Sequence, residues 1–186
     1  MRAGARRNDW TVLEETYLLT HAGRIPKREI CKHLKRSARS VRDKAYHLRL
    51  QGHMIDLRCY VPRLSTCPAC GCLRSKLGHQ GICEPCRKRE QLATIHHRTA
   101  LLLARLPLRE RETYADTEAE TESRPDPMPK APNTHGMSYY QRERAREAHE
   151  VAMEAWTTAN LQRQVKAAQK RKERIEKKVE SMRLCE

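Results

Sequence analysis

The sequence predicts a mainly α-helical protein made of small modules: three short helices, a cysteine-rich ribbon, and further helices that include one long C-terminal helix. Three observations lead to this fold class. Apolar residues recur at helical spacing in the first fifty residues, two Cys-x-x-Cys pairs follow, and no Pro or Gly occurs between Ser138 and Leu184. The chain of 186 residues has no Phe and 33% charged residues, so we expect several small cores rather than a large one.

The first fifty residues should form three short helices. Thr11 and Glu14 make a capping box that starts the first helix, and Gly23 suits its end. Pro26 can open the second helix, and Ser37 can cap the third. The side chains expected to face inward are Leu13, Tyr17, Leu18, Ile30, Leu34, Val41, Ala45 and Leu48.

The outer face of the third helix is polar and basic. At about 100° per residue, Arg39, Asp43 and His47 point away from Val41. The first fifty residues hold thirteen Lys or Arg against five Asp or Glu, and the whole chain has a formal net charge of +15. Such a surplus favours nucleic acid as a partner, and the layout is that of a helix-turn-helix whose third helix enters the major groove of double-stranded DNA. The candidate DNA contacts are Arg36, Arg39, Ser40, Arg42, Asp43, Lys44 and His47.

A wider motif covers residues 8–50. It consists of Trp10-Thr11, Glu14-Glu15, Ile30, Leu34, Arg36-Ser37, Ser40-Val41, Lys44-Ala45 and Leu48-x-Leu50. This motif resembles the Myb/SANT-like helix-turn-helix of bacterial and phage DNA-binding proteins. The resemblance implies transcriptional regulation, in a phage or mobile element. SANT-like domains also bind proteins, so a protein-docking module is the alternative.

The two cysteine pairs, Cys-Pro-Ala-Cys and Cys-Glu-Pro-Cys, are separated by twelve residues. This is the spacing of a four-thiolate zinc site, because a two-residue gap lets one tight turn present both sulfurs to the same ion. Gly71 follows the first pair, where such a turn often needs a positive φ. We therefore expect a zinc ribbon with structural Zn²⁺ and no open coordination position, while Cys72 and His79 could substitute as ligands. The expected ligands are Cys67, Cys70, Cys83 and Cys86.

The segments around the ribbon are less distinctive. Residues 54–61 could add a strand to the ribbon, and residues 87–105 should form a helix that is interrupted by Pro107. Residues 108–123 should form an acidic helix. This helix is either solvated, or in contact with a basic protein surface such as one on RNA polymerase, or an intramolecular screen for the basic modules of the chain. Four prolines between residues 123 and 136 predict a semi-extended linker.

The C-terminal segment predicts one long helix. Ser138 and Gln141 make a second capping box. Apolar positions then alternate in steps of four and three over residues 161–182, as in a coiled coil, which could form a homodimer. Residues 166–178 are dense in Lys and Arg, which is consistent with a DNA-backbone contact, a coiled-coil flank or a solvated helix. The repeating positions are Leu161, Val165, Ala168, Lys172, Ile175, Val179 and Met182.

Together these observations predict a cytoplasmic, DNA-binding transcriptional regulator that is not an enzyme. The sequence has no phosphate-cradling glycine loop and no nucleophile paired with a base, and its longest apolar run stops at Arg105, too short to span a membrane. The alternative is an adaptor that binds RNA polymerase or another protein and has little sequence-specific DNA affinity. The expected modules are 1–50, 51–88, 89–123, 124–137 and 138–186.

Overall fold

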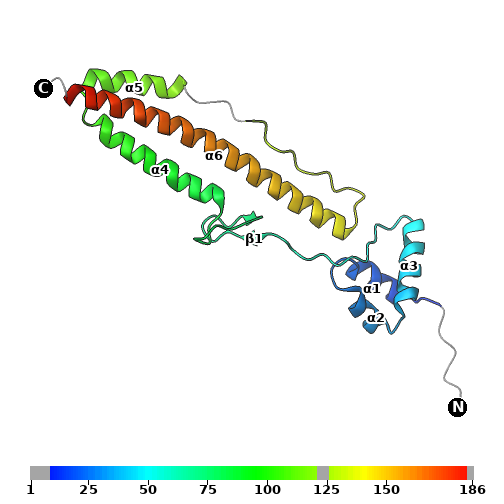
Figure 1. The fold of residues 1–186 in the computed structure, drawn as a ribbon. Helices are drawn as coiled ribbons and strands as arrows, with labels where there is room; N and C mark the ends of the chain where they lie inside the picture. Colours follow the sequence, from blue (N-terminus) through cyan, green and yellow to red (C-terminus); the bar gives the residue numbers. More distant parts are fainter. Residues whose placement is uncertain (1–8, 121–125, 184–186) are drawn as a thin grey trace, which may run out of the picture. The chain divides into compact units, whose positions relative to one another are not determined.

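The computed structural model describes residues 9–120 and 126–183, and it confirms a mainly helical fold with one long C-terminal helix (Figure 1). The chain forms two compact units. The first unit combines the chain up to Arg63 with Ala131–Ala148, and the second combines Leu64–Lys130 with the residues from His149 onward. None of the described helices is both long enough and apolar enough to cross a membrane.

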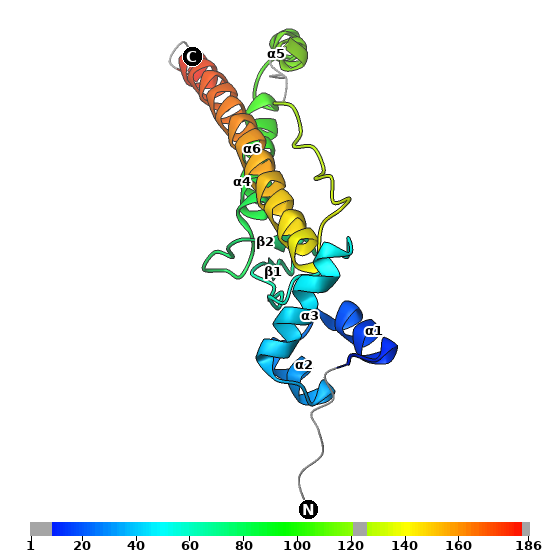
Figure 2. The same ribbon diagram turned by 90° about the vertical axis from the view of Figure 1, so that its right-hand side faces the viewer.

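The first unit contains three short helices (Figure 2). The predicted capping box is confirmed, since the Thr11 hydroxyl accepts from the Glu14 backbone N–H and the Glu14 carboxylate accepts from that of Thr11. The predicted cap at Ser37 is also confirmed, with its hydroxyl accepting from the N–H of Ser40. The helices are α1 (Val12–His21), α2 (Lys27–Leu34) and α3 (Ala38–Leu50).

A small apolar core joins these helices. Leu18, Ile30 and Val41 are each 0% exposed, so every helix contributes at least one fully buried side chain. Burial of such a side chain typically contributes about 1.5–3 kcal/mol. The expected inward position of Leu13 is wrong, because this side chain is 82% exposed. It lies about 140° around the helix from Leu18, which is the α1 residue that enters the core.

The segment after α3 does not form the expected strand. Residues 54–61 have no strand, and Ile55 is buried in the three-helix core. Tyr60 then fixes this segment at two points. Its backbone N–H donates to the carbonyl of Gly23 at 2.7 Å, and its hydroxyl donates to Glu147 at 2.8 Å. The segment therefore belongs to the three-helix unit and not to the cysteine-rich ribbon.

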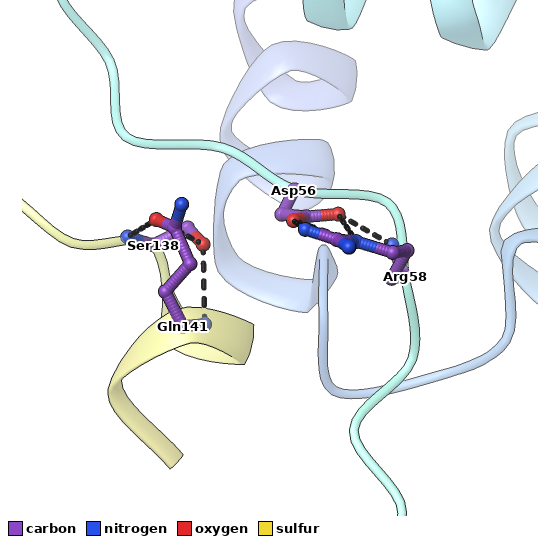
Figure 3. A network of polar contacts seen from close by, with 4 residues as sticks. All are labelled: Asp56, Arg58, Ser138 and Gln141. Carbon is purple, nitrogen blue, oxygen red and sulfur yellow. Dashed lines mark hydrogen bonds and ion pairs between the residues drawn. The ribbon is translucent and has the colours of Figure 1, made fainter. Parts of the chain in front are cut away.

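The start of α6 (Tyr139–Arg183) completes the first unit. The predicted capping box is confirmed: the N–H of Ser138 donates to Gln141 at 2.9 Å, and the N–H of Gln141 donates to the Ser138 hydroxyl at 3.4 Å (Figure 3). Figure 3 also shows the Asp56 carboxylate, which accepts three hydrogen bonds from the Arg58 side chain and one from its backbone.

Gly23 allows α6 to approach the turn after α1. Its φ is +82°, and a Cβ atom placed there would lie 3.3 Å from both the ring of Tyr139 and the backbone nitrogen of Tyr140. Arginine side chains cover the same tyrosines, with Arg24 over Tyr139 at 4.4 Å and Arg58 over Tyr140 at 4.5 Å. A side chain at position 23 would therefore be strained and would disturb the first turn of α6.

The second unit begins with a short hairpin. Strand β1 (Ser65–Thr66) pairs antiparallel with β2 (Leu73–Arg74), so that Ser65 faces Arg74. Helix α4 (Glu84–Leu103) follows, and then α5 (Leu108–Glu120). Helix α4 begins three residues earlier than the sequence suggested. The second cysteine pair thus lies at the start of a helix. The cysteine-bearing part of the chain is therefore a hairpin followed by a helix, and not a ribbon made of strands alone.

A second core lies where α4, α5 and α6 meet (Figure 1). Leu106, Ile175 and Val179 are buried there, with Tyr114 and Met182 packed against them. The apolar positions predicted as a coiled-coil seam are therefore covered, in part, by the chain itself. Dimerisation through residues 161–182 stays a prediction.

The predicted linker has neither helix nor strand over residues 126–134, and part of it lies along α6. The indole N–H of Trp156 donates to the carbonyl of Asp126 at 2.7 Å, and His149 contacts the carbonyl of Pro129 at 3.3 Å. Arg163 also forms an ion pair with Asp126. These contacts tie the described part of the linker to the helix that follows it.

Candidate metal centre and candidate nucleic-acid interface

The hairpin holds the first cysteine pair in a tight turn. The backbone N–H of Cys67 donates to the carbonyl of Cys72 at 2.9 Å, and that of Gly71 donates to the carbonyl of Cys67 at 2.8 Å. Gly71 has a φ of +69°, as the sequence predicted for this turn. The turn presents the sulfurs of Cys67 and Cys70 on one side of the hairpin.

The second pair is held by the first turn of α4. Cys83 is the N-cap residue of the helix, Pro85 occupies an early helical position, and Cys86 is one turn further on. The backbone N–H of Cys83 donates to the sulfur of Cys67 at 3.4 Å, which links the helix start to the hairpin. A helix N-terminus carries a partial positive charge, so this position favours anionic sulfur.

The hairpin and the helix bring the four cysteines together. All four sulfurs lie within 4.8 Å of one another, and the Cys70 and Cys83 sulfurs are 3.8 Å apart. A tetrahedral zinc ion with Zn–S bonds of about 2.3 Å would place its sulfurs about 3.8 Å apart. The cluster can therefore hold a metal ion. Cys72 is exposed and its sulfur lies against the carbonyl of Cys70, so it is outside the cluster.

The charges around the sulfurs match a set of metal-bound thiolates. Arg74 is only 5% exposed, and its guanidinium lies 4.0 Å from the sulfur of Cys70. Arg89 approaches the sulfur of Cys86 at 3.9 Å. A buried guanidinium stays charged and requires an anionic partner. No carboxylate hydrogen-bonds to Arg74 within residues 9–120 and 126–183, so the thiolates are its natural counter-charge.

The thiols themselves do not favour four negative charges without a cation. Burial raises the pKa of Cys86 to about 12, whereas the backbone N–H of Cys72 lowers the pKa of Cys70 to about 6. Four ionised sulfurs at this separation would repel one another. A bound metal removes this conflict, because it binds the deprotonated form of each thiol. The residues therefore fit a Cys₄ metal site.

One carboxylate of α6 supports the hairpin. Glu154 is 8% exposed, and it accepts hydrogen bonds from the backbone N–H of Ser75 at 2.9 Å and from the Ser75 hydroxyl at 2.8 Å. Ser75 directly follows strand β2, which carries Arg74. No local sequence pattern pointed to this contact, because the two residues are 79 positions apart.

Replacing Arg74 by Gln should loosen the metal site. The substitution removes the buried positive charge beside the Cys70 sulfur, and loss of such an outer partner typically costs about 10–100-fold in metal affinity. Competition between the protein and a chromophoric zinc chelator would measure this change. Lys76→Gln is the matched control, because Lys76 is exposed on the same hairpin. Equal zinc affinity in the two variants would mean that Arg74 does not support the site.

The predicted DNA-contact residues divide into two groups. The side chains of Arg39, Arg42, Asp43 and His47 are exposed on the outer face of α3, and Ser40 is partly buried beside them. Arg39 has only a loose ion pair with Asp43 at 3.9 Å, and its side chain is 88% exposed. Several of these residues line a shallow open groove that also includes Trp10 and Ser37.

The other group, Arg36 and Lys44, is tied to α1. The Arg36 guanidinium donates to Glu14 at 3.2 Å and to the carbonyl of Asp9 at 2.6 Å. Its side-chain hydrogen bond lowers the pKa of Glu14 to about 2. Lys44 forms an ion pair with Glu15.

Trp10 connects this pair, since Arg36 lies 5.2 Å and Lys44 6.0 Å from its ring centre. The motif residues thus form a contact network between the start of α1 and α3. The sequence reasoning placed Arg36 and Lys44 in the candidate interface and missed this structural role. The acidic pair at positions 14 and 15, one turn after Trp10, was the available signal.

Comparisons of the chain with protein-family models, with curated proteins and with solved structures find no match.

Proposed function

We propose that this protein is a DNA-binding transcriptional regulator that contacts duplex DNA through the outer face of α3. The observation that carries the proposal is the contrast between the two faces of this helix. Val41, Ala45 and Leu48 are buried on one side, Arg39 is exposed on the opposite side, and Arg42 is exposed at the flank between them. A short helix with these two faces, preceded by two others, is consistent with a helix-turn-helix, and the sequence motif of residues 8–50 resembles the Myb/SANT-like type.

The availability of the two arginines supports this function. Arg42 forms no hydrogen bond or ion pair with any part of the chain that the structure describes, and the ion pair of Arg39 is long and exposed. Guanidinium groups can bind a guanine edge or a phosphate through two hydrogen bonds. In this proposal Arg39, Arg42 and His47 face the DNA, whereas Arg36 and Lys44 hold the helix in place.

The metal centre has a structural role in the proposal. Zn²⁺ is the metal that a closed Cys₄ set favours, and Cys67, Cys70, Cys83 and Cys86 would hold it. Bound zinc would supply folding free energy to the hairpin and the start of α4. Since all four donors come from the chain, the site leaves no position for a catalytic water.

The test is a selection of bound sequences from a pool of random duplexes. Wild-type protein should enrich a common motif. Arg39→Ala should relax the preference at one or two base pairs, which corresponds to a loss of about 1–3 kcal/mol of discrimination. Lys32→Ala removes an exposed cation from α2 and is the control. It should weaken binding to all sequences about equally and leave the motif unchanged.

A protein-binding adaptor is the second candidate, and two exposed apolar side chains favour it. Tyr46 is 55% exposed and Leu50 is 68% exposed, and both lie on α3. An adaptor would enrich no sequence motif. It would be retained by immobilised RNA polymerase or another protein without DNA, and Tyr46→Ala with Leu50→Ser would reduce that retention.

A further inference from the structure

The second half of α6 carries two groups of cations with different surroundings. Arg163, Lys172 and Lys178 form ion pairs with Asp126, Glu176 and Glu110, respectively. Arg171 donates to the carbonyl of Tyr114. These side chains have partners in the second unit. Four other cations are exposed and have no hydrogen bond or ion pair within residues 9–120 and 126–183. They are Lys166, Lys170, Arg174 and Lys177.

These four residues, which we name the α6 basic stripe, lie on one side of the helix. At about 100° per residue they fall within an arc of about 80°, and the centre of the arc is opposite the buried Ile175 and Val179. The stripe is about 16 Å long at 1.5 Å per residue. Glu173 lies at its edge and accepts a hydrogen bond from Gln169. The stripe is thus a narrow, mainly positive strip on a rigid helix.

Its exposure has an energetic consequence. Four neighbouring cations on one helix face repel one another, since like charges three or four residues apart are destabilising. An acidic residue at one of these positions would relieve the repulsion, as Glu176 and Glu110 do for the packed cations. The arrangement instead leaves four positive charges for a partner with closely spaced negative charges.

We propose that the α6 basic stripe binds the phosphate backbone of duplex DNA without regard to base sequence, as a second contact surface. The inference concerns a different surface from α3, but it rests on the proposed function for the choice of DNA as partner. Duplex DNA carries one negative charge per about 1.7 Å of its axis, so a strip of about 16 Å can meet several phosphates. Lysine ammonium groups on flexible stems suit such contacts, which need no fixed hydrogen-bond geometry.

An anionic membrane has similar charge but fits the helix less well. A helix that lies on a membrane inserts an apolar face between the lipids. Here the apolar side of α6 is already used, because Ile175 is 0% and Val179 8% exposed against Leu106 and its neighbours. The stripe itself presents charged ends only. Nucleic acid is therefore the partner that this surface favours.

The experiment measures the affinity of the full-length protein for one random-sequence duplex at several salt concentrations. The test variant replaces all four stripe residues by Gln: Lys166→Gln, Lys170→Gln, Arg174→Gln and Lys177→Gln. The slope of log K against log[salt] falls by about 0.9 for each phosphate contact that is lost, so a drop of about 3 is expected. At about 0.1 M salt, affinity should fall at least about tenfold.

A second variant has the same net charge as the stripe variant, but its α6 basic stripe is intact. It replaces four exposed cations elsewhere in the second unit: Arg98→Gln, Arg105→Gln, Arg109→Gln and Lys130→Gln. Its slope should change by less than about 1. Circular dichroism should show unchanged helix content for both variants.

Three results would overturn the inference. The slopes of the two variants could fall equally, which would mean that net charge alone matters. The slope of the stripe variant could equal that of the wild type. The stripe variant could also lose binding to vesicles of phosphatidylserine while its DNA slope stays the same, which would assign the stripe to a membrane. This experiment uses a duplex of random sequence, so its result does not depend on base-specific binding by α3. The α3 proposal is tested separately, by the selection of bound sequences and by Arg39→Ala.

Discussion

Removal of the metal proposed for the Cys₄ site should unfold the hairpin and the first turn of α4 while α1, α2 and α3 stay folded. The hairpin has two residues in each strand, and its buried core consists of Cys67, Cys83 and Cys86. Such a unit has little apolar surface to bury, so metal binding must provide most of its folding free energy, typically about 10–16 kcal/mol. The three-helix core is separate and contains none of the four sulfurs.

Hydrogen exchange of the amides before and after addition of a strong chelator would test this result. Protection should be lost for the amides of Cys67, Gly71 and Cys83, and it should be kept at Val41 and Leu48. Cys67→Ser combined with Cys70→Ser should give the same pattern and should bind no stoichiometric zinc. Cys72→Ser is the matched control and should retain both zinc and protection. Stoichiometric zinc in the double variant would contradict the ligand assignment.

Ile175→Ala should lower the free energy of unfolding of the second unit by about 2–5 kcal/mol. The side chain is 0% exposed and packs with Leu106 and Val179, so its removal leaves a cavity between α6 and the α4–α5 region. Val151 lies on the same helix and is 41% exposed, so Val151→Ala should lower the free energy of unfolding much less. Thermal unfolding followed by circular dichroism would compare the two variants.

The same experiment tests how the apolar side of α6 is used. If Ile175 stabilises the chain internally, the unfolding temperature of the wild type should not depend on protein concentration. If residues 161–182 form a dimer, as the repeating pattern first suggested, the unfolding temperature should rise with concentration. The decrease in unfolding temperature caused by Ile175→Ala should then be largest at high protein concentration, where the dimer is most populated.

Local signals in the sequence predicted the local structure well. The capping boxes at Thr11 and Ser138, the cap at Ser37 and the positive φ at Gly71 are all present. These features depend on residues within three or four positions of one another, so the sequence contains the whole interaction. The Cys-x-x-Cys pairs are also local features, because the two residues between the cysteines determine the turn that each pair forms.

Features that depend on distant partners were not predictable in the same way. A basic residue on an exposed helix face looks the same in a sequence whether it meets DNA or an acidic side chain of the same protein. Arg36 and Lys44 are of the second kind, because Glu14 and Glu15 reach them from α1. Helical spacing likewise placed Leu13 in the core, although Leu18 is the buried residue of α1 and Leu13 is 82% exposed. The contact of Glu154 with Ser75 had no sequence signal at all.

The first unit has one feature that governs the order in which the chain can fold during synthesis. Its residues come from two separate stretches, up to Arg63 and Ala131–Ala148, with part of the second unit between them. The hydrogen bond from Tyr60 to Glu147 spans 87 residues. At ribosome speeds of about 5–20 residues per second, Tyr60 is made roughly 4–17 s before its partner exists. The three helices must therefore persist as a partly finished nascent domain until the start of α6 leaves the ribosome and closes it.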